Sequence, residues 1–284
     1  MIPKVAVIHD ISGLGRCSLT AAIPVLSALG VQACPVPTAV LSNQTGYPSY
    51  ALLDCEPVLR RFPEEWRKRG IRLDGIYTGF FSSLRQIAAA QTLIDEFRGS
   101  RPLLLVDPIM ADHGERYPGF DDAMCAGIAS LVRQADIVTP NLTEACLLTG
   151  EDYAAVFRDS GAEVQRAALQ RMAKALLGMG AGIAVITGWR QGESIYNAAA
   201  QGDSFRLYGS PAVEGSYSGT GDLFASALCG QLVKGAALEP AIRRAARFLE
   251  VSLRGAAHSA DYNPDGIPFE PRLQLLMEND NAQE

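Results

Sequence analysis

The chemically most informative part of the sequence is the run Ser218-Gly219-Thr220-Gly221-Asp222, which opens a predicted helix over 221–232. Glycine lets a backbone turn tightly and approach a ligand closely. The first amides of a helix have no partner within the helix and carry the positive end of its dipole, so such a turn is typical of an anion-binding site. Asp222 then has two interpretations: a favourable charge in the first helical turn, or a base that takes a proton from a hydroxyl attacking a bound phosphoryl group.

Other signatures of phosphate and nucleotide binding are missing from the sequence. There is no Gly-x-x-x-x-Gly-Lys-Ser/Thr motif, and neither His-Arg-Asp nor Asp-Phe-Gly occurs, which excludes a P-loop enzyme and a protein kinase. Gly13 and Gly15 lack the third glycine of the dinucleotide fingerprint, which argues against a nicotinamide site. The three histidines, His9, His113 and His258, are scattered and suggest no metal site, and His258 is expected at a helix end.

The elements that must position Asp222 follow from the hydrophobic pattern, in which short apolar runs alternate with segments of helical periodicity. This alternation predicts an α/β fold with a mostly parallel sheet covered on both faces. No linker or change of composition divides the chain, so we expect one domain over 1–284 with a polar tail at about 278–284. The predicted strands are 4–9, 31–36, 75–78, 103–107, 137–139, 183–187 and a hairpin of 194–199 with 204–208. The predicted helices are 18–29, 58–69, 84–97, 121–133, 143–148, 163–177, 221–232 and 240–257.

Polar residues that directly follow the predicted strands are the natural candidates for a site, because ligands of such sheets bind at the carboxyl ends of the strands. They lie at 10–12, 38–45, 107–112, 139–144, 187–188 and 219–222.

Five segments in these regions resemble a known family when they are taken together and in order. They are Asp10-Ile11-Ser12-Gly13-Leu14-Gly15-Arg16-Cys17-Ser18, Leu41-Ser42-Asn43-Gln44-Thr45, Asp107-Pro108-Ile109-Met110-Ala111-Asp112, Thr139-Pro140-Asn141 with Glu144, and Gly219-Thr220-Gly221-Asp222. From Val5 to about Ala257, the chain resembles the pyridoxal/pyridoxamine kinase family of the ribokinase-like superfamily. The resemblance implies a three-layer αβα sandwich. It also implies an ATP-dependent kinase that phosphorylates the 5′-hydroxymethyl group of pyridoxal, pyridoxine or pyridoxamine.

The resemblance assigns roles to the acids. Asp222 matches the family's catalytic base, and the amides of Gly219, Thr220 and Gly221 would stabilise charge on the transferring phosphoryl group. Asp107 and Glu144 match the acids that organise Mg²⁺ and ATP, largely through water, as suits this ion. Without the resemblance, Asp107 would be a strand-end acid and Glu144 a surface acid of a helix. Asp112 resembles a second acid near the phosphates or near a monovalent cation such as K⁺, whose requirement stays open.

The resemblance also implies residues that contact the substrate and the nucleotide. Ser12 and Thr45 match hydroxyl residues that bind the substrate ring, and Tyr117 resembles a loop aromatic residue that covers it. Standing alone, Ser12 and Thr45 would be ordinary turn residues. Thr139, Thr187 and Thr220 match positions at the nucleotide phosphates, although some relatives have lysine where Thr187 stands. The segment 215–218 would form the loop beside the nucleotide.

Two alternatives remain beside a vitamin B6 kinase. Related hydroxymethylpyrimidine kinases share the fold but often have cysteine at the position of the base, so Asp222 disfavours that substrate without excluding it. A catalytically inactive protein that holds a B6 compound or a nucleotide would be expected to have lost Asp222, Asp107 or Glu144, and all three are present. A sugar kinase is disfavoured by Ser12 and Thr45. Some relatives have a reactive cysteine where Ser218 stands, so covalent capture of an aldehyde there is not expected.

Composition limits the partners and the compartment. The net charge of −6 disfavours nucleic-acid binding. The six cysteines form no Cys-x-x-Cys pair, which suits a reducing compartment. No signal-peptide pattern and no apolar run of about 18 residues is found, so we expect a cytoplasmic protein away from membranes. ATP and a small heteroaromatic alcohol are the expected ligands, and the resemblance implies a homodimer.

Overall fold

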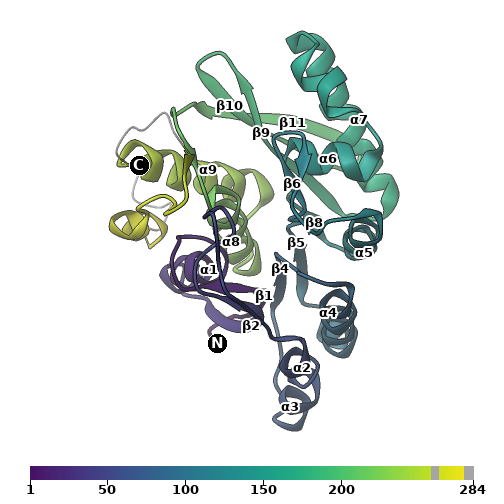
Figure 1. The fold of residues 1–284 in the computed structure, drawn as a ribbon, viewed down its shortest axis with the longest axis vertical. Helices are drawn as coiled ribbons and strands as arrows, with labels where there is room; N and C mark the ends of the chain where they lie inside the picture. Colours follow the sequence, from purple (N-terminus) through teal and green to yellow (C-terminus); the bar gives the residue numbers. More distant parts are fainter. Residues whose placement is uncertain (257–261, 278–284) are drawn as a thin grey trace.

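A computed structural model describes residues 1–256 and 262–277, and its centre is one nine-stranded sheet (Figure 1). The strand order is β11-β10-β9-β8-β5-β4-β1-β2-β3. The six strands from β9 to β2 in this order are parallel to their neighbours, whereas β10, β11 and β3 pair in antiparallel fashion. The predicted, mostly parallel sheet is therefore confirmed. The strands are β1 (Lys4–Ser12), β2 (Gln32–Leu41), β3 (Leu52–Asp54), β4 (Gly75–Thr78), β5 (Leu103–Val106), β8 (Ile137–Val138), β9 (Ile183–Gln191), β10 (Ser194–Gln201) and β11 (Ser204–Pro211).

Helices cover both faces of this sheet and give it three layers (Figure 1). Because side chains of a strand alternate between the two faces, Val5 and Val7 of β1 enter one core and Ala6 and Ile8 enter the other. The first core includes α1 (Ser18–Ala28), α8 (Thr220–Val233) and α9 (Leu238–Arg254). The second includes α4 (Leu84–Phe97), α5 (Asp122–Val132), α6 (Leu142–Thr149) and α7 (Ala162–Met179). None of the helices in the described part of the chain is long and apolar enough to cross a membrane.

The predicted helix over 58–69 is wrong as a continuous element. The structure has two short helices there, α2 (Glu56–Leu59) and α3 (Phe62–Lys68). Pro63 lies in the first turn of α3. Proline has no amide hydrogen to donate and its ring clashes with the carbonyl group four residues earlier, so Pro63 favours the start of a new helix at this position.

Several short elements had no sequence signal strong enough to predict them. They are β3, the pairs β6 (Ala111–Asp112) with β7 (Glu115–Arg116) and β12 (Ser216–Tyr217) with β13 (Tyr262–Asn263), the 3-10 segments Arg98–Ser100 and Glu270–Leu276, and the π-helical turn Ala154–Arg158. The last long helix ends at Arg254, three residues earlier than predicted. His258 and the expected tail at 278–284 lie outside the described residues.

The strand order creates a site at one edge of the sheet. From β1 the chain passes to β2 on one side, and it returns to β4 on the other side of β1. The crossovers leaving two such strands run in opposite directions, which opens a crevice at their carboxyl ends. The β1–β2 register shifts between His9 and Ile11 at this edge. Such irregularities are frequent beside active sites because they redirect side chains.

We predict opposite effects of alanine at two glycines near the end of α7, Gly178 inside the helix and Gly180 directly after it. Gly180 has φ +126°, and an added Cβ would lie 2.2 Å from the carbonyl oxygen of Arg133. Gly180→Ala should therefore lower the free energy of unfolding by roughly 1–3 kcal/mol. Gly178 lies in the helix with open space around an added Cβ, so Gly178→Ala should raise it by roughly 0.5–1 kcal/mol. Denaturant unfolding measures both, and equal effects would contradict the prediction.

Candidate active site

The glycine-rich turn packs directly against the connection between β1 and α1. Gly219 precedes α8 in the left-handed conformation, with φ +78°, and an added Cβ would lie 2.0 Å from the carbonyl oxygen of Arg16. A side chain cannot be accommodated at this position. An added Cβ on Gly221 would lie 4.0 Å from Oδ2 of Asp107, so the turn also reaches the carboxyl end of β5. The predicted turn and Asp107, the acid that follows β5, are therefore brought together.

Asp222 is buried in the first turn of α8, with 7 % of its surface exposed. Its two oxygens are held from two directions. Oδ1 lies 2.9 Å from Nε2 of His9, and Oδ2 accepts a hydrogen bond of 2.8 Å from the backbone amide of Ser18. Ser18 donates this bond from a left-handed conformation with φ +52°, which is uncommon for a residue other than glycine. The carboxylate thus has a fixed orientation.

His9 lies between two carboxylates, and it was not among the residues predicted for the site. Its Nδ1 is 2.9 Å from Oδ1 of Asp10, opposite the contact with Asp222. Burial by itself lowers the pKa of His9, but the charge of Asp222 and the hydrogen bonds with Asp10 and Asp222 raise it to about 10. Burial would raise the pKa of Asp10, but the hydrogen bond and charge of His9 hold it below its usual value. A usable signal was an ionisable pair, His9 and Asp10, at the end of an apolar strand.

Asp107 and Glu144 form a second acidic pair in the interior. Asp107 is 5 % exposed and accepts a hydrogen bond of 3.0 Å from the hydroxyl of Thr139. Burial and the charge of Asp222 raise the pKa of Asp107 to about 7. Glu144 is 3 % exposed, so the interpretation of Glu144 as a surface acid is wrong. Burial and the charge of Asp107 raise the pKa of Glu144 well above its usual range.

Glu144 is held in place by backbone amides. Its Oε2 accepts from the amide of Asn141, whose side chain accepts in turn from the amide of Glu144, which forms a capping box at the start of α6. Its Oε1 accepts from the amide of Met110 at 3.1 Å. One carboxylate therefore joins the segment after β5 to the start of α6.

The other predicted residues take different positions around these acids. Ser12 is fully buried and donates its hydroxyl to Asp10 at 3.1 Å, so it joins the group through Asp10. Thr187 pairs with Asn141 beside the end of β8. Thr45 is exposed, the side chain of Asp112 is 45 % exposed, and Tyr117 is partly exposed beside Phe120. The structure thus brings together Ser12, Asp107, Thr139, Glu144, Gly221 and Asp222, whereas Thr45 and Tyr117 lie on outer segments. Asp112 is partly exposed, and its charge contributes to the raised pKa of Glu144.

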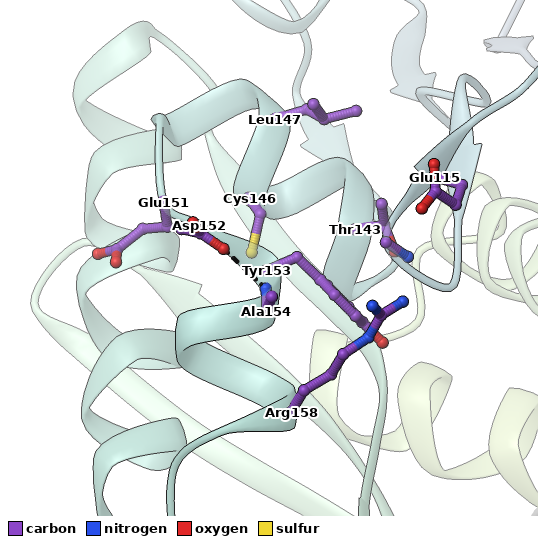
Figure 2. A pocket seen from close by; sticks show the side chains of 10 residues that line it. Glu115, Thr143, Cys146, Leu147, Glu151, Asp152, Tyr153, Ala154 and Arg158 are labelled. Carbon is purple, nitrogen blue, oxygen red and sulfur yellow. Dashed lines mark hydrogen bonds between the residues drawn. The ribbon is translucent and has the colours of Figure 1, made fainter.

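A separate pocket of about 260 Å³ lies beside α6 (Figure 2). Thr143, Cys146 and Tyr153 line it, and the guanidinium group of Arg158 lies 5.6 Å from the centre of the Tyr153 ring. Arg158 also donates to the carbonyl oxygen of His113 at 2.9 Å. None of the predicted site residues lines this pocket.

Known proteins with similar sequences and structures include both B6 kinases and pyrimidine kinases. The family model described as phosphomethylpyrimidine kinase matches residues 15–265. A crystal structure of a putative phosphomethylpyrimidine kinase from Bacteroides thetaiotaomicron, in an orthorhombic form with pyridoxal, is 36% identical with a TM-score of 0.88, covering 97% of this chain and 96% of that one. Pyridoxal kinase from Lactobacillus plantarum is 28% identical with a TM-score of 0.83, covering 98% and 97%.

Curated relatives divide in the same way. A pyridoxine/pyridoxal/pyridoxamine kinase from Bordetella bronchiseptica is 30% identical over 82% of this chain and 82% of its own length. A hydroxymethylpyrimidine/phosphomethylpyrimidine kinase from Mycobacterium leprae is 30% identical over 85% of each chain. These matches confirm the resemblance inferred from the five segments and the ribokinase-like fold. The chain belongs to the phosphomethylpyrimidine kinase family, whose model spans its glycine-rich turn and most of its sheet.

Proposed function

We propose that this protein is an ATP-dependent kinase that phosphorylates the 5′-hydroxymethyl group of a B6 vitamer. The observation that carries the proposal is the position of Asp222, a buried carboxylate fixed at the N-terminus of α8. A proton acceptor and an anion-binding turn thus occupy the same place, which is what phosphoryl transfer to a hydroxyl requires. The choice of a B6 vitamer is supported by the 36% identical structure with pyridoxal and by the curated B6 kinases.

In the proposed reaction, the substrate hydroxyl attacks the γ-phosphorus of ATP in line with the departing ADP. Asp222 takes the proton of this hydroxyl as the new O–P bond forms and the bond to the β-phosphate oxygen breaks. The amides of Gly219, Thr220 and Gly221 stabilise the charge on the phosphoryl oxygens. Thr139 and Thr187 are proposed to lie near the nucleotide phosphates.

Asp107 and Glu144 are suited to hold Mg²⁺ together with ATP. Both are buried, and each is near enough to another acid to raise its pKa, so a cation between them would relieve an unfavourable interaction. Within residues 1–256 and 262–277, no group of three or more histidine, cysteine, aspartate or glutamate side chains is arranged to hold a metal. Binding through water and phosphate oxygens fits this donor set. When bound, Mg²⁺ supplies positive charge to the phosphate oxygens. Asp112 is proposed as the further acid near the phosphates or near K⁺.

The substrate ring is proposed to lie near Ser12, Thr45 and Tyr117. Thr45 and Tyr117 have exposed surface with which to meet a ligand. Ser12 is already bonded to Asp10, so a contact between its hydroxyl and the ring would have to be shared with that carboxylate. The recognition of the ring therefore depends on Asp10 as well as on Ser12.

Hydroxymethylpyrimidine is the second candidate substrate, because the family model and the 30% identical relative from Mycobacterium leprae are described as pyrimidine kinases. The transfer chemistry would be the same, since it needs only a hydroxymethyl group beside Asp222. A binding protein without activity is disfavoured, since Asp222, Asp107 and Glu144 are all held by specific contacts.

The assembly and compartment follow from the family resemblance. We propose a homodimer in the cytoplasm. All six cysteines are free thiols in the structure, which suits a reducing compartment.

The activity prediction concerns ADP release from Mg-ATP in the presence of one acceptor at a time. Turnover is expected with pyridoxal, pyridoxine or pyridoxamine, and Asp222→Asn should lower kcat by roughly 10²- to 10⁴-fold because the base is lost. Turnover with hydroxymethylpyrimidine alone would replace the B6 assignment by the second candidate. No turnover with any acceptor, while ligands still bind, would favour the inactive binding protein.

The stability prediction concerns Asp107 in the metal-free protein. Folding raises the pKa of Asp107 from 3.8 to about 7, so the folded state holds a proton that the unfolded state has released. Wild-type stability therefore falls as the pH rises through this range. Asp107→Asn has no proton to lose and should be more stable than wild type at pH 8, by on the order of a few kcal/mol, with a smaller difference at pH 5.

Denaturant unfolding in the presence of a chelator measures this difference at both pH values. Asp95→Asn is the matched control, because Asp95 is an exposed acid of α4. A gain from Asp107→Asn that is equal at pH 5 and pH 8 would show that ionisation of Asp107 costs no stability.

The assembly prediction is a sedimenting species of twice the chain mass in sedimentation velocity at micromolar concentration. A single species of the chain mass over the same range of concentration would contradict the homodimer.

A further inference from the structure

His9 is the buried group next to Asp222 that the proposed reaction has not used. By alternation along β1 it follows Val5 and Val7 onto the face covered by α8, which directs its ring toward Asp222. The ring lies against the backbone after β4, because a Cβ on Gly79 would be 2.1 Å from Cδ2 of His9. Glycine at that position leaves the space that the imidazole occupies.

The carboxylates on either side of His9 are linked to one another a second time. Ser18 donates its backbone amide to Asp222, and its side chain stabilises the ionised form of Asp10. Asp10, His9, Asp222 and Ser18 thus lie together at the edge of the sheet. This group joins β1, α1 and α8, and His9 and Asp222 are 213 positions apart in the sequence.

The two carboxylates beside His9 favour a charged imidazole. Ionised carboxylates only accept hydrogen bonds, so both ring nitrogens of His9 carry hydrogen when Asp222 and Asp10 are both ionised and lie 2.9 Å away. The backbone amides of Asp10 and Phe80 also point to Nδ1, at 3.0 and 3.4 Å. They would favour a neutral ring with a bare Nδ1, but that ring would place its lone pair against a carboxylate oxygen of Asp10. The two carboxylates outweigh the two amides, and the raised pKa of His9 agrees with this.

We propose that His9 is a positioning residue for the transfer reaction, a cation between Asp10 and Asp222 that fixes the carboxylate of Asp222 and offsets its charge. Charge-assisted bonds are the stronger kind, and they hold an oxygen in place without a cost at the moment of reaction. The groups that face His9 are Asp10 from its own strand, Asp222 from α8, and the Tyr77 ring from β4, which is nearly perpendicular to the imidazole. Asp107, directly after β5, adds a more distant acidic group. The proposal rests on the proposed function, in which Asp222 is the base.

The kinetic test compares wild type with His9→Gln, which can still donate one neutral hydrogen bond but carries no charge. We expect kcat to fall by roughly 10- to 100-fold while KM for ATP stays within about twofold. The acidic limb of kcat/KM should move to higher pH by about one unit, because the adjacent cation that favours an ionised carboxylate is lost. A histidine that only packs the core would leave that limb in place, and this result, or an unchanged kcat, would overturn the proposal.

Asp10→Asn gives a second variant that leaves Asp222 and His9 intact. It should shift the acidic limb in the same direction by a smaller amount. If both residues act through one cation, the double variant should lose no more activity than His9→Gln alone. Independent losses that multiply in the double variant would overturn the shared role. Thermal unfolding and ADP binding of each variant identify losses that come from misfolding.

A measurement without turnover completes the test. The chain has three histidines, so ¹⁵N-histidine spectra are simple, and the resonance lost in His9→Gln belongs to His9. We expect both ring nitrogens of His9 to be protonated in wild type at pH 8. In Asp222→Asn, the His9 ring should lose one proton at a lower pH than it does in wild type. A neutral His9 ring at pH 8 would overturn the proposal. A wild type with no kinase activity would overturn the proposed function and this role with it, whereas an active wild type with an unaffected His9→Gln would overturn the role of His9 alone.

Discussion

The structure depends on the accommodation of several acidic side chains in its interior, at one edge of the sheet. Asp10, Asp107, Glu144 and Asp222 are all buried there. A buried charge is costly unless it is paired or hydrogen-bonded, and like charges raise this cost. Each acid has a hydrogen-bonding partner nearby. The imidazole of His9 contacts Asp10 and Asp222, a threonine hydroxyl donates to Asp107, and backbone amides donate to Glu144. Such a cluster has no value for stability alone, which is why it points to chemistry.

The topology explains how residues so distant in the sequence meet. Parallel strands have their carboxyl ends at the same edge, so the residues that follow β1, β5 and β8 converge without any long loop. The helix α8 packs on the face of β1 and presents its N-terminus to that edge. Gly219 and Gly79 then allow the approach, because a methyl group at either position would strike a neighbouring residue. The glycines matter here for the space that they leave.

Local sequence patterns were sufficient to predict most of the elements and three of the acids. Features that depend on tertiary contacts were not predicted. Apolar runs identified most of the central strands, and motif spacing identified Asp107, Glu144 and Asp222. The burial of Glu144 was missed because its capping box reads the same on a surface helix. His9 was missed because its partner Asp222 is distant in the chain, and the left-handed Ser18 has no signature in its residue type. The break before Pro63 was predictable and was overlooked.

The division of the relatives into B6 kinases and pyrimidine kinases has a physical counterpart in this structure. The acids proposed to take part in the transfer are buried and held by contacts from several elements, and both candidate substrates would offer them the same hydroxymethyl group. The residues proposed to meet the ring include Thr45 and Tyr117, which lie on exposed segments outside the sheet. Exposed segments tolerate change better than a buried cluster of charges does. The transfer reaction can therefore stay constant in this family while the ring that carries the hydroxymethyl group changes. Similarity over the whole fold thus predicts the type of reaction more firmly than it predicts the substrate.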